Sequence, residues 1–166
     1  MRSLAVLIAA LIMIPERGQA CGVDTDCELG GRTYRISMPQ ERSTGPVGAL
    51  VYAHGYRGSA GAAMKNKALR ELAHEHGMAL VAIKSAGDDW LIPGVPENPQ
   101  ETGDKEFDYV DAVIADLSSR HGIDTDRLIA TGFSAGGMMV WDLACRMGNR
   151  FAAFLPVAGT FWEPVP

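Results

Sequence analysis

A serine set between two glycines is the feature of this sequence that most constrains its fold. The motif Gly-Phe-Ser-Ala-Gly at 132–136 follows the apolar run 128–130 and precedes the apolar segment 138–141. A G-x-S-x-G between a strand and a helix predicts a nucleophile elbow, a sharp turn that exposes the serine hydroxyl above a sheet. Side chains at the two glycine positions would collide with backbone in such a turn. The alternative is a glycine-rich turn whose serine merely caps the helix.

Apolar runs alternate with amphipathic segments along the rest of the chain. We expect an edge strand at 32–38, buried strands at 49–53, 79–83 and 128–131, and a further strand at 152–158. Helices are expected at 65–76, 105–121 and 135–147, with a long loop at 85–104. This alternation predicts an α/β fold, a mostly parallel sheet with helices on both faces. Ligands bind such sheets at the carboxyl ends of the strands. The loops after 53 and 83 and the elbow after 131 should therefore meet at one crevice.

Charge and histidine spacing exclude several classes of partner. A formal net charge of -5 argues against nucleic acid, because phosphate binding needs a basic face. His74 and His76 are two residues apart on a predicted helix, so they point in different directions and do not form a metal pair. We expect neither a metal site nor a cofactor.

The N-terminus has the pattern of a secretory signal peptide. Arg2 precedes the apolar run 4–14, and Gly-Gln-Ala at 18–20 ends in the small residues that signal peptidase accepts. The apolar run is short for a membrane span, although a retained anchor and a lipoprotein at Cys21 are alternatives. We therefore predict a signal peptide at 1–20, one secreted domain at 21–166, and no stable membrane anchor.

Export would permit disulfide bonds. Cys21 and Cys27 lie close enough in the sequence to pair at the new N-terminus. Cys145 is left over, so it is either a buried free thiol or its partner lies outside this chain.

Ser134 needs a base and an electrostatic trap for the oxyanion if it is to act as a nucleophile. The backbone N–H of Ala135, the residue after the nucleophile, is one predicted donor of that oxyanion hole. The glycine-rich loop at 54–58 should supply the second. Gly55 would let the backbone approach the substrate, and the N–H of Tyr56 is the predicted donor.

Three segments together resemble a known family. The segments 51–55, 122–137 and 151–159 closely resemble secreted polyhydroxybutyrate depolymerase-like and feruloyl-esterase-like enzymes, which are serine hydrolases of the α/β-hydrolase superfamily. The resemblance extends over about residues 30 to 162. It implies an ester hydrolase that forms an acyl-enzyme on Ser134, with Tyr56 and Ala135 at the oxyanion hole.

The same resemblance places His54, Gly55 and the long loop with Asp88, Asp89 and Trp90 at the substrate cleft. Trp90 is either an apolar platform for an acyl or aromatic group or a packing anchor under the loop. Polyhydroxyalkanoate, feruloyl-polysaccharide and acetyl-xylan esters all fit the expected crevice, so the substrate is a small ester, a polyester or a feruloyl polysaccharide.

The sequence departs from the family in its catalytic acid and base. In this superfamily an Asp or Glu and then a His follow the serine, yet none of the four histidines follows Ser134. His54 belongs to the oxyanion loop, and His121 ends a predicted helix. Glu163 could stand in for the acid or be a solvated residue, and Asp142 is better explained as a cap or an ion-pair partner.

We therefore expect the front portion of an esterase, truncated at its C-terminus. A ligand-binding fragment that lacks the triad Asp and His is the alternative, and a peptidase of the same superfamily is a third possibility. The missing strands would leave an open sheet edge, which predicts self-association.

Overall fold

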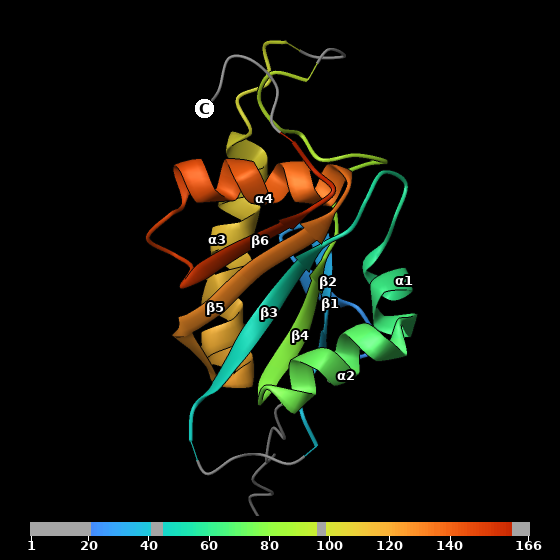
Figure 1. The fold of residues 1–166 in the computed structure, drawn as a ribbon, viewed down its shortest axis with the longest axis vertical. Helices are drawn as coiled ribbons and strands as arrows, with labels where there is room; N and C mark the ends of the chain where they lie inside the picture. Colours follow the sequence, from blue (N-terminus) through green and yellow to red (C-terminus); the bar gives the residue numbers. More distant parts are fainter. Residues whose placement is uncertain (1–20, 41–44, 96–98, 161–166) are drawn as a thin grey trace, which may run out of the picture.

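The computed structural model describes residues 21–40, 45–95 and 99–160 as one six-stranded sheet between two layers of helices (Figure 1). The predicted signal peptide at 1–20 and Glu163 lie outside the described residues. The strands are β1 (Cys27–Leu29), β2 (Arg32–Ser37), β3 (Val47–Ala53), β4 (Met78–Ile83), β5 (Ile123–Phe133) and β6 (Ala153–Val157). The helices are α1 (Ala60–Lys65), α2 (Lys67–Glu75), α3 (Asp104–His121) and α4 (Ala135–Arg146).

The sheet has the order β1-β2-β4-β3-β5-β6. β3 pairs in parallel with β4 and β5, and β5 pairs in parallel with β6, whereas β1 and β2 run antiparallel to their neighbours. The predicted mostly parallel sheet is therefore confirmed. The chain leaves β3 toward β4 and returns on its other side as β5, so the switch point lies between the carboxyl ends of β3 and β5. Those ends carry the loop after Ala53 and the serine motif.

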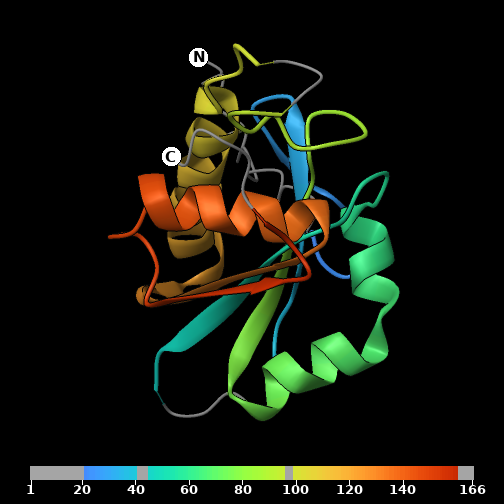
Figure 2. The same ribbon diagram turned by 45° about the horizontal axis from the view of Figure 1, so that its top comes forward.

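Alternate residues of the central strands pack into two separate cores. Ala49, Val51 and Ala53 of β3 face α3 and α4, whereas Leu50 and Tyr52 face α1 and α2. Figures 1 and 2 show α3 and α4 on one face of the sheet and α1 and α2 on the other. Continuous apolar runs form these strands because both faces are covered.

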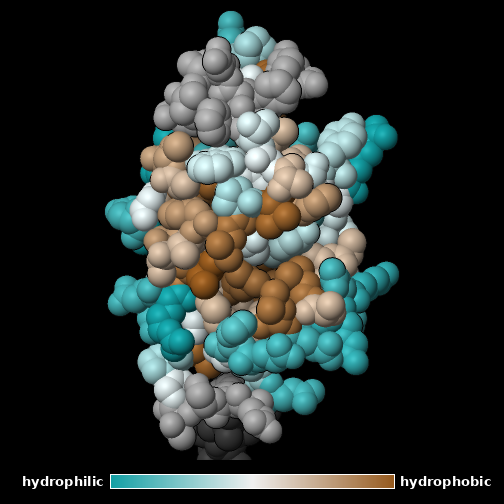
Figure 3. All heavy atoms as spheres, viewed as in Figure 1, coloured by the Kyte–Doolittle hydropathy of each residue, from teal (hydrophilic) through white to brown (hydrophobic). Residues whose placement is uncertain are grey.

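On the α2 side the cover is incomplete. An apolar groove of about 950 Å³ lies beside α2, and its lining includes Leu50, Leu72, Ile129, Leu155 and Val157. Figure 3 shows apolar side chains gathered over this part of the sheet. Leu155 and Val157 are each about half exposed. We call this surface the apolar groove.

Several predicted elements have different boundaries in the structure, and the strand predicted at 128–131 is longer, running as β5 from Ile123 to Phe133. The predicted edge strand at 32–38 is β2, and β1 lies outside it, joined through Gly30 and Gly31 at φ 58° and 82°. Two adjacent glycines at positive φ make a tight hairpin turn, so this pair was the signal for β1. The predicted helix at 65–76 is two helices, with Asn66 ending α1 and capping α2 through its side chain.

The cysteines are placed in part as expected. Cys21 and Cys27 form a disulfide, the pairing that their closeness in the sequence allowed. Cys145 is a free thiol that is exposed on α4, so the alternative of a buried thiol does not hold. Among the described helices, none is long and apolar enough to cross a membrane.

Candidate active site

Ser134 lies in the turn between β5 and α4, at the carboxyl edge of the sheet. Its backbone has φ 56° and ψ -120°, a conformation that a residue with a side chain adopts only when its surroundings impose it. The Ser134 N–H donates to the Val157 carbonyl at 2.9 Å, and the Ser134 carbonyl accepts from Gly137 N–H and Met138 N–H. These bonds tie the serine to β6 and to the first turn of α4.

The two glycines of the motif leave space for neighbouring backbone. A Cβ at Gly132 would lie 2.3 Å from the Gly136 carbonyl oxygen, and one at Gly136 would lie 2.0 Å from the Ala53 carbonyl oxygen. Helix α4 therefore begins in direct contact with the end of β3. The strand–turn–helix context that the motif needs to form a nucleophile elbow is present.

The glycine-rich loop at 54–58 lies against the serine. A Cβ on Gly55 would be 3.2 Å from the Phe133 carbonyl oxygen and 3.5 Å from Ser134 Cβ. Within the described part of the chain, no hydrogen bond uses the N–H of Tyr56 or that of Ala135, whereas Arg57 N–H donates to the Asp88 carbonyl. The structure thus leaves free the two N–H groups that the sequence assigns to an oxyanion hole, at the ends of two adjoining turns.

His54 is a buried neutral ring that shapes this loop. It bonds the Gly55 carbonyl through Nδ1 at 2.8 Å and accepts the Ser85 N–H on Nε2 at 3.2 Å, so Nδ1 carries the proton. Burial lowers the pKa of His54, and Lys84 and Arg32 add to that effect. Because both ring nitrogens are occupied, His54 has no free nitrogen with which to accept a proton from Ser134.

Trp90 lies beneath the same loop. Its side chain is 2% exposed, its Nε1–H donates to the His54 carbonyl at 2.7 Å, and its ring lies 5.0 Å from the His54 ring. This is the packing alternative, and it leaves the ring without an open face for a ligand. The exposed aromatic side chains beside Ser134 are instead Tyr56 and Phe133, both more than half exposed.

A second set of polar contacts was not singled out from the sequence. Arg57, at φ 54°, pairs with Asp88 at 3.1 Å across the top of the two loops. Glu106 of α3, completely buried, pairs with Arg32 at 2.7 Å below them. The length of the 85–104 loop was a sequence signal for the first contact, because a long loop in a compact domain usually has a function. Arg32 and Glu106 both lie outside that loop.

The other candidate acids and bases belong to other contacts. His74 bonds Ser37, and His76 lines the apolar groove. Asp142 is 3% exposed on α4, and burial raises its pKa to about 6 against the opposing charge of Arg146.

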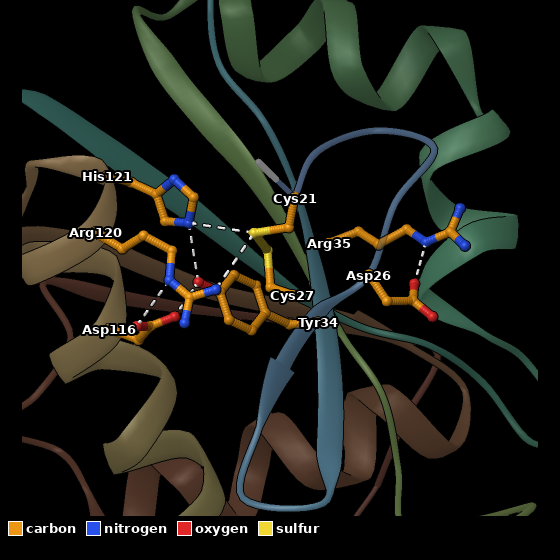
Figure 4. Close-up of a disulfide and its surroundings, with 8 residues drawn as sticks. All are labelled: Cys21, Asp26, Cys27, Tyr34, Arg35, Asp116, Arg120 and His121. Carbon is orange, nitrogen blue, oxygen red and sulfur yellow. Dashed lines mark hydrogen bonds and ion pairs between the residues drawn. A yellow bond between two sulfur atoms is a disulfide. The ribbon is translucent and has the colours of Figure 1, made fainter. Parts of the chain in front are cut away.

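His121 lies beside the disulfide at the end of α3 (Figure 4). Its Nε2 is 3.7 Å from Cys21 Sγ and 3.0 Å from Tyr34 Oη, and Tyr34 in turn donates to Asp116. In the described ranges, Cys21, Cys27 and His121 are the one group whose ligand atoms are close enough for a metal. Its two sulfurs are bonded to each other, so the cluster serves here to attach the disulfide to α3.

Comparisons with known proteins agree with this geometry. Residues 72–162, more than half of the chain, match the model of the prolyl oligopeptidase family. A putative esterase, NocK of Nocardia uniformis subsp. tsuyamanensis, is 32% identical over 96% of this chain and 48% of its own length. A probable feruloyl esterase C of Aspergillus clavatus is 27% identical over 79% of this chain and 47% of its own. The chain thus spans about half the length of these curated relatives.

Solved structures show the same fold. The fluorophosphonate-binding serine hydrolase FphF of Staphylococcus aureus superposes with a TM-score of 0.62 at 18% identity, over 77% of this chain and 51% of that one. An acetyl xylan esterase from Paenibacillus sp. R4 superposes with a TM-score of 0.56 at 25% identity, over 78% of this chain and 45% of that one. The predicted α/β-hydrolase fold is confirmed.

Proposed function

Because the chain belongs to the prolyl oligopeptidase family, we propose that it is a secreted serine hydrolase of carboxylic esters that acts through an acyl-enzyme on Ser134. One observation carries the proposal. Ser134 is held at φ 56° beside two turns whose N–H groups, on Tyr56 and Ala135, have no hydrogen-bond partner among the described residues. Free donors beside a strained serine are what acyl transfer requires.

In the proposed reaction, Ser134 Oγ attacks the ester carbonyl and its proton passes to a base. The carbonyl oxygen becomes an oxyanion and accepts hydrogen bonds from Tyr56 N–H and Ala135 N–H. Ala135 is also the first residue of α4, a 12-residue helix whose N-terminal dipole favours the negative charge. Expulsion of the alcohol leaves the acyl-enzyme, which water then hydrolyses. We assign the base to no residue of the described chain.

Esters are the proposed substrates because the relatives that match over most of this chain are named as esterases. Tyr56 and Phe133 give the site exposed aromatic walls suited to an acyl or aromatic group. Small acetyl esters, feruloyl esters and polyhydroxybutyrate are the substrate classes to compare. The family match makes peptide hydrolysis the second candidate. Hydrolysis of a peptidyl aminomethylcoumarin in the absence of p-nitrophenyl ester hydrolysis would favour it.

A fluorophosphonate probe tests the nucleophile directly. The probe should label the parent chain and the Ser119→Ala variant, which removes an exposed serine of α3, but not Ser134→Ala. Equal labelling of the parent chain and Ser134→Ala would contradict the proposal. Saturable binding of an ester with neither labelling nor turnover would instead support the alternative, a domain that binds its ligand without hydrolysis.

We also propose that residues 1–20 are a signal peptide and that 21–166 are a secreted α/β-hydrolase domain. The disulfide between Cys21 and Cys27 supports this, because such bonds persist in oxidising compartments. N-terminal sequencing of the secreted product should begin at Cys21. A product that begins at Met1 would contradict the processing.

Self-association is proposed through the apolar groove rather than by pairing of strand edges. Among the described strands, β6 is an edge strand that pairs with β5 alone. Val157 directs its carbonyl to Ser134, so the alternate residue Pro156 faces the outer edge, where it offers no N–H donor. Leu155→Asp should lower the mass observed by sedimentation equilibrium if the groove mediates association. An unchanged mass distribution would exclude the groove as the interface.

A further inference from the structure

The loop after β4 clamps the loop that carries the proposed oxyanion donor. We call residues 84–91 the clamp loop. Hydrogen bonds join it to residues 54–58, among them Ser85 N–H to His54 Nε2 at 3.2 Å, Trp90 Nε1–H to the His54 carbonyl at 2.7 Å, and Arg57 N–H to the Asp88 carbonyl at 2.7 Å. The position of Tyr56 N–H relative to Ser134 therefore depends on where the clamp loop lies.

One carboxylate holds both ends of the clamp loop. Glu106 Oε1 accepts the N–H of Leu91 at 3.2 Å, at the far end of the loop. Glu106 Oε2 pairs with Arg32 Nη2 at 2.7 Å, and the same nitrogen donates to the Lys84 carbonyl at 2.6 Å, at the near end. Removing this carboxylate would release one end directly and the other through Arg32.

The pair is buried and closely enclosed. Glu106 is completely buried, and the Arg32 side chain is 16% exposed. The guanidinium stacks 3.7 Å above the Tyr109 ring, and Tyr109 Oη accepts Lys84 N–H at 3.2 Å. Within the described residues, Arg32 Nε and Nη1 have no hydrogen-bond partner, so Glu106 is the one carboxylate that offsets the charge of this guanidinium. A buried pair of this kind is weak evidence for a role in stability.

We propose that Glu106 is a positioning residue that, through the clamp loop, fixes Tyr56 N–H at the oxyanion site beside Ser134. The inference rests on the proposed function, because it assigns that N–H to the oxyanion. Glu106 touches no substrate; it acts through Leu91, Arg32 and the clamp loop. A misplacement of about 1 Å in a catalytic group can lower a rate about a hundredfold, so small movements of the loop should be visible in kinetics.

Glu106→Gln tests the role while keeping the size of the side chain. Its matched control is Asp26→Asn, which breaks the ion pair that Asp26 forms with Arg35, another arginine of β2 (Figure 4). For a fluorophosphonate, we expect Glu106→Gln to lower the maximal labelling rate at Ser134 by about 10- to 100-fold, while the inhibitor concentration at half-maximal rate changes less than about twofold. Asp26→Asn should leave both parameters unchanged. A change in the inhibitor concentration at half-maximal rate alone would overturn the proposal. So would equal falls in the maximal labelling rate of the two variants.

Hydrogen exchange separates this proposal from the proposed function. In Glu106→Gln, amides of 54–58 should exchange about tenfold faster than in the parent chain, whereas those of α4 should not change. This result, in a parent chain that is not labelled, would show that Glu106 positions residues 54–58 but would reject the esterase and, with it, the oxyanion role of Tyr56 N–H. Unchanged exchange at 54–58 would overturn the positioning role whatever the labelling. If Glu106→Gln does not fold, Tyr109→Phe takes its place. This variant removes only the hydrogen bonds of Tyr109 Oη to Lys84 N–H and to the Thr33 carbonyl, and the same labelling and exchange measurements test it.

Discussion

Replacing the buried carboxyl of Asp142 by an amide should stabilise the protein near neutral pH but hardly at all in acid. Asp142 is 3% exposed on α4, and burial raises its pKa from 3.8 to about 6, while Arg146 one turn later lowers it in part. Between these two pH values the folded chain retains a proton that the unfolded chain has released. Stability is therefore lost as the pH rises through this window, and the loss is complete above about pH 6.

The magnitude follows from the pKa difference. A shift of about two units costs about 3 kcal/mol of folding free energy at pH 7.5 and about 0.5 kcal/mol at pH 4. Asparagine resembles the protonated acid and does not ionise. Asp142→Asn should thus gain up to about 3 kcal/mol at pH 7.5, or about 6 to 12 °C in Tm for a chain of this size, and almost nothing at pH 4.

Urea denaturation at pH 4 and pH 7.5 measures the difference between parent and variant at each pH. Asp111→Asn is the control, because its carboxylate is half exposed and pairs with Arg150 at 2.7 Å. That variant should change stability by less than about 1 kcal/mol at either pH. If Asp142→Asn gains the same amount at both pH values, or is less stable at pH 7.5, burial of the charge is not what destabilises the parent chain.

Three further changes should affect stability. Gly136→Ala should cost about 3 kcal/mol or more in urea denaturation, because its Cβ would lie 2.0 Å from a backbone carbonyl oxygen of β3; a cost below about 1 kcal/mol would contradict the close contact. Cys27→Ser should cost about 2 kcal/mol, since Cys21 and Cys27 close a loop of six-residue separation, and a scan of the parent chain with and without reductant should reproduce the loss. Burial lowers the pKa of His54 in the folded chain. The contribution of His54 to the free energy of unfolding is therefore full above its unfolded pKa of about 6.5 and is lost as the pH falls through the lowered value. The drop in Tm from pH 7.5 to 5 should be smaller in His54→Asn, which cannot be protonated and can still accept the Ser85 N–H; an equal drop would contradict this.

Local sequence was sufficient for the elements that place the serine. Uninterrupted apolar runs predicted the central strands, and the helix predicted to end at 121 does end there, followed by Gly122 at φ 67°. The motif predicted the elbow because its two glycines have a steric reason that neighbouring residues reveal. The short β1 was missed because three residues show no alternation, although the Gly30–Gly31 turn before β2 was visible.

The supports of the site are contacts between distant segments, and local patterns do not encode them. Glu106 reads as one of several charged residues at the start of a helix, and its partner Arg32 lies 74 residues away in the sequence. Trp90 could equally have been a ligand platform or a buried anchor, because only the fold brings His54 over it. The exposure of Cys145 depended in the same way on which side of α4 packs against the sheet.

The strand order has a consequence for how this chain folds. β3 pairs on one side with β5, where Ala49 lies beside Leu128, and on the other with β4, where Ala49 lies beside Ala79, so the chain between the paired strands is much shorter for β4 than for β5. Contacts between distant segments form late, because the entropy of closing the intervening chain must be overcome first. During synthesis, β2, β4 and β3 can assemble with α1 and α2 while the edge of β3 that pairs with β5 is still unpaired. Until residue 133 emerges from the ribosome, the nascent chain exposes one edge of β3, a strand that is later buried on both faces. Aggregation or chaperone binding should be greatest in this interval.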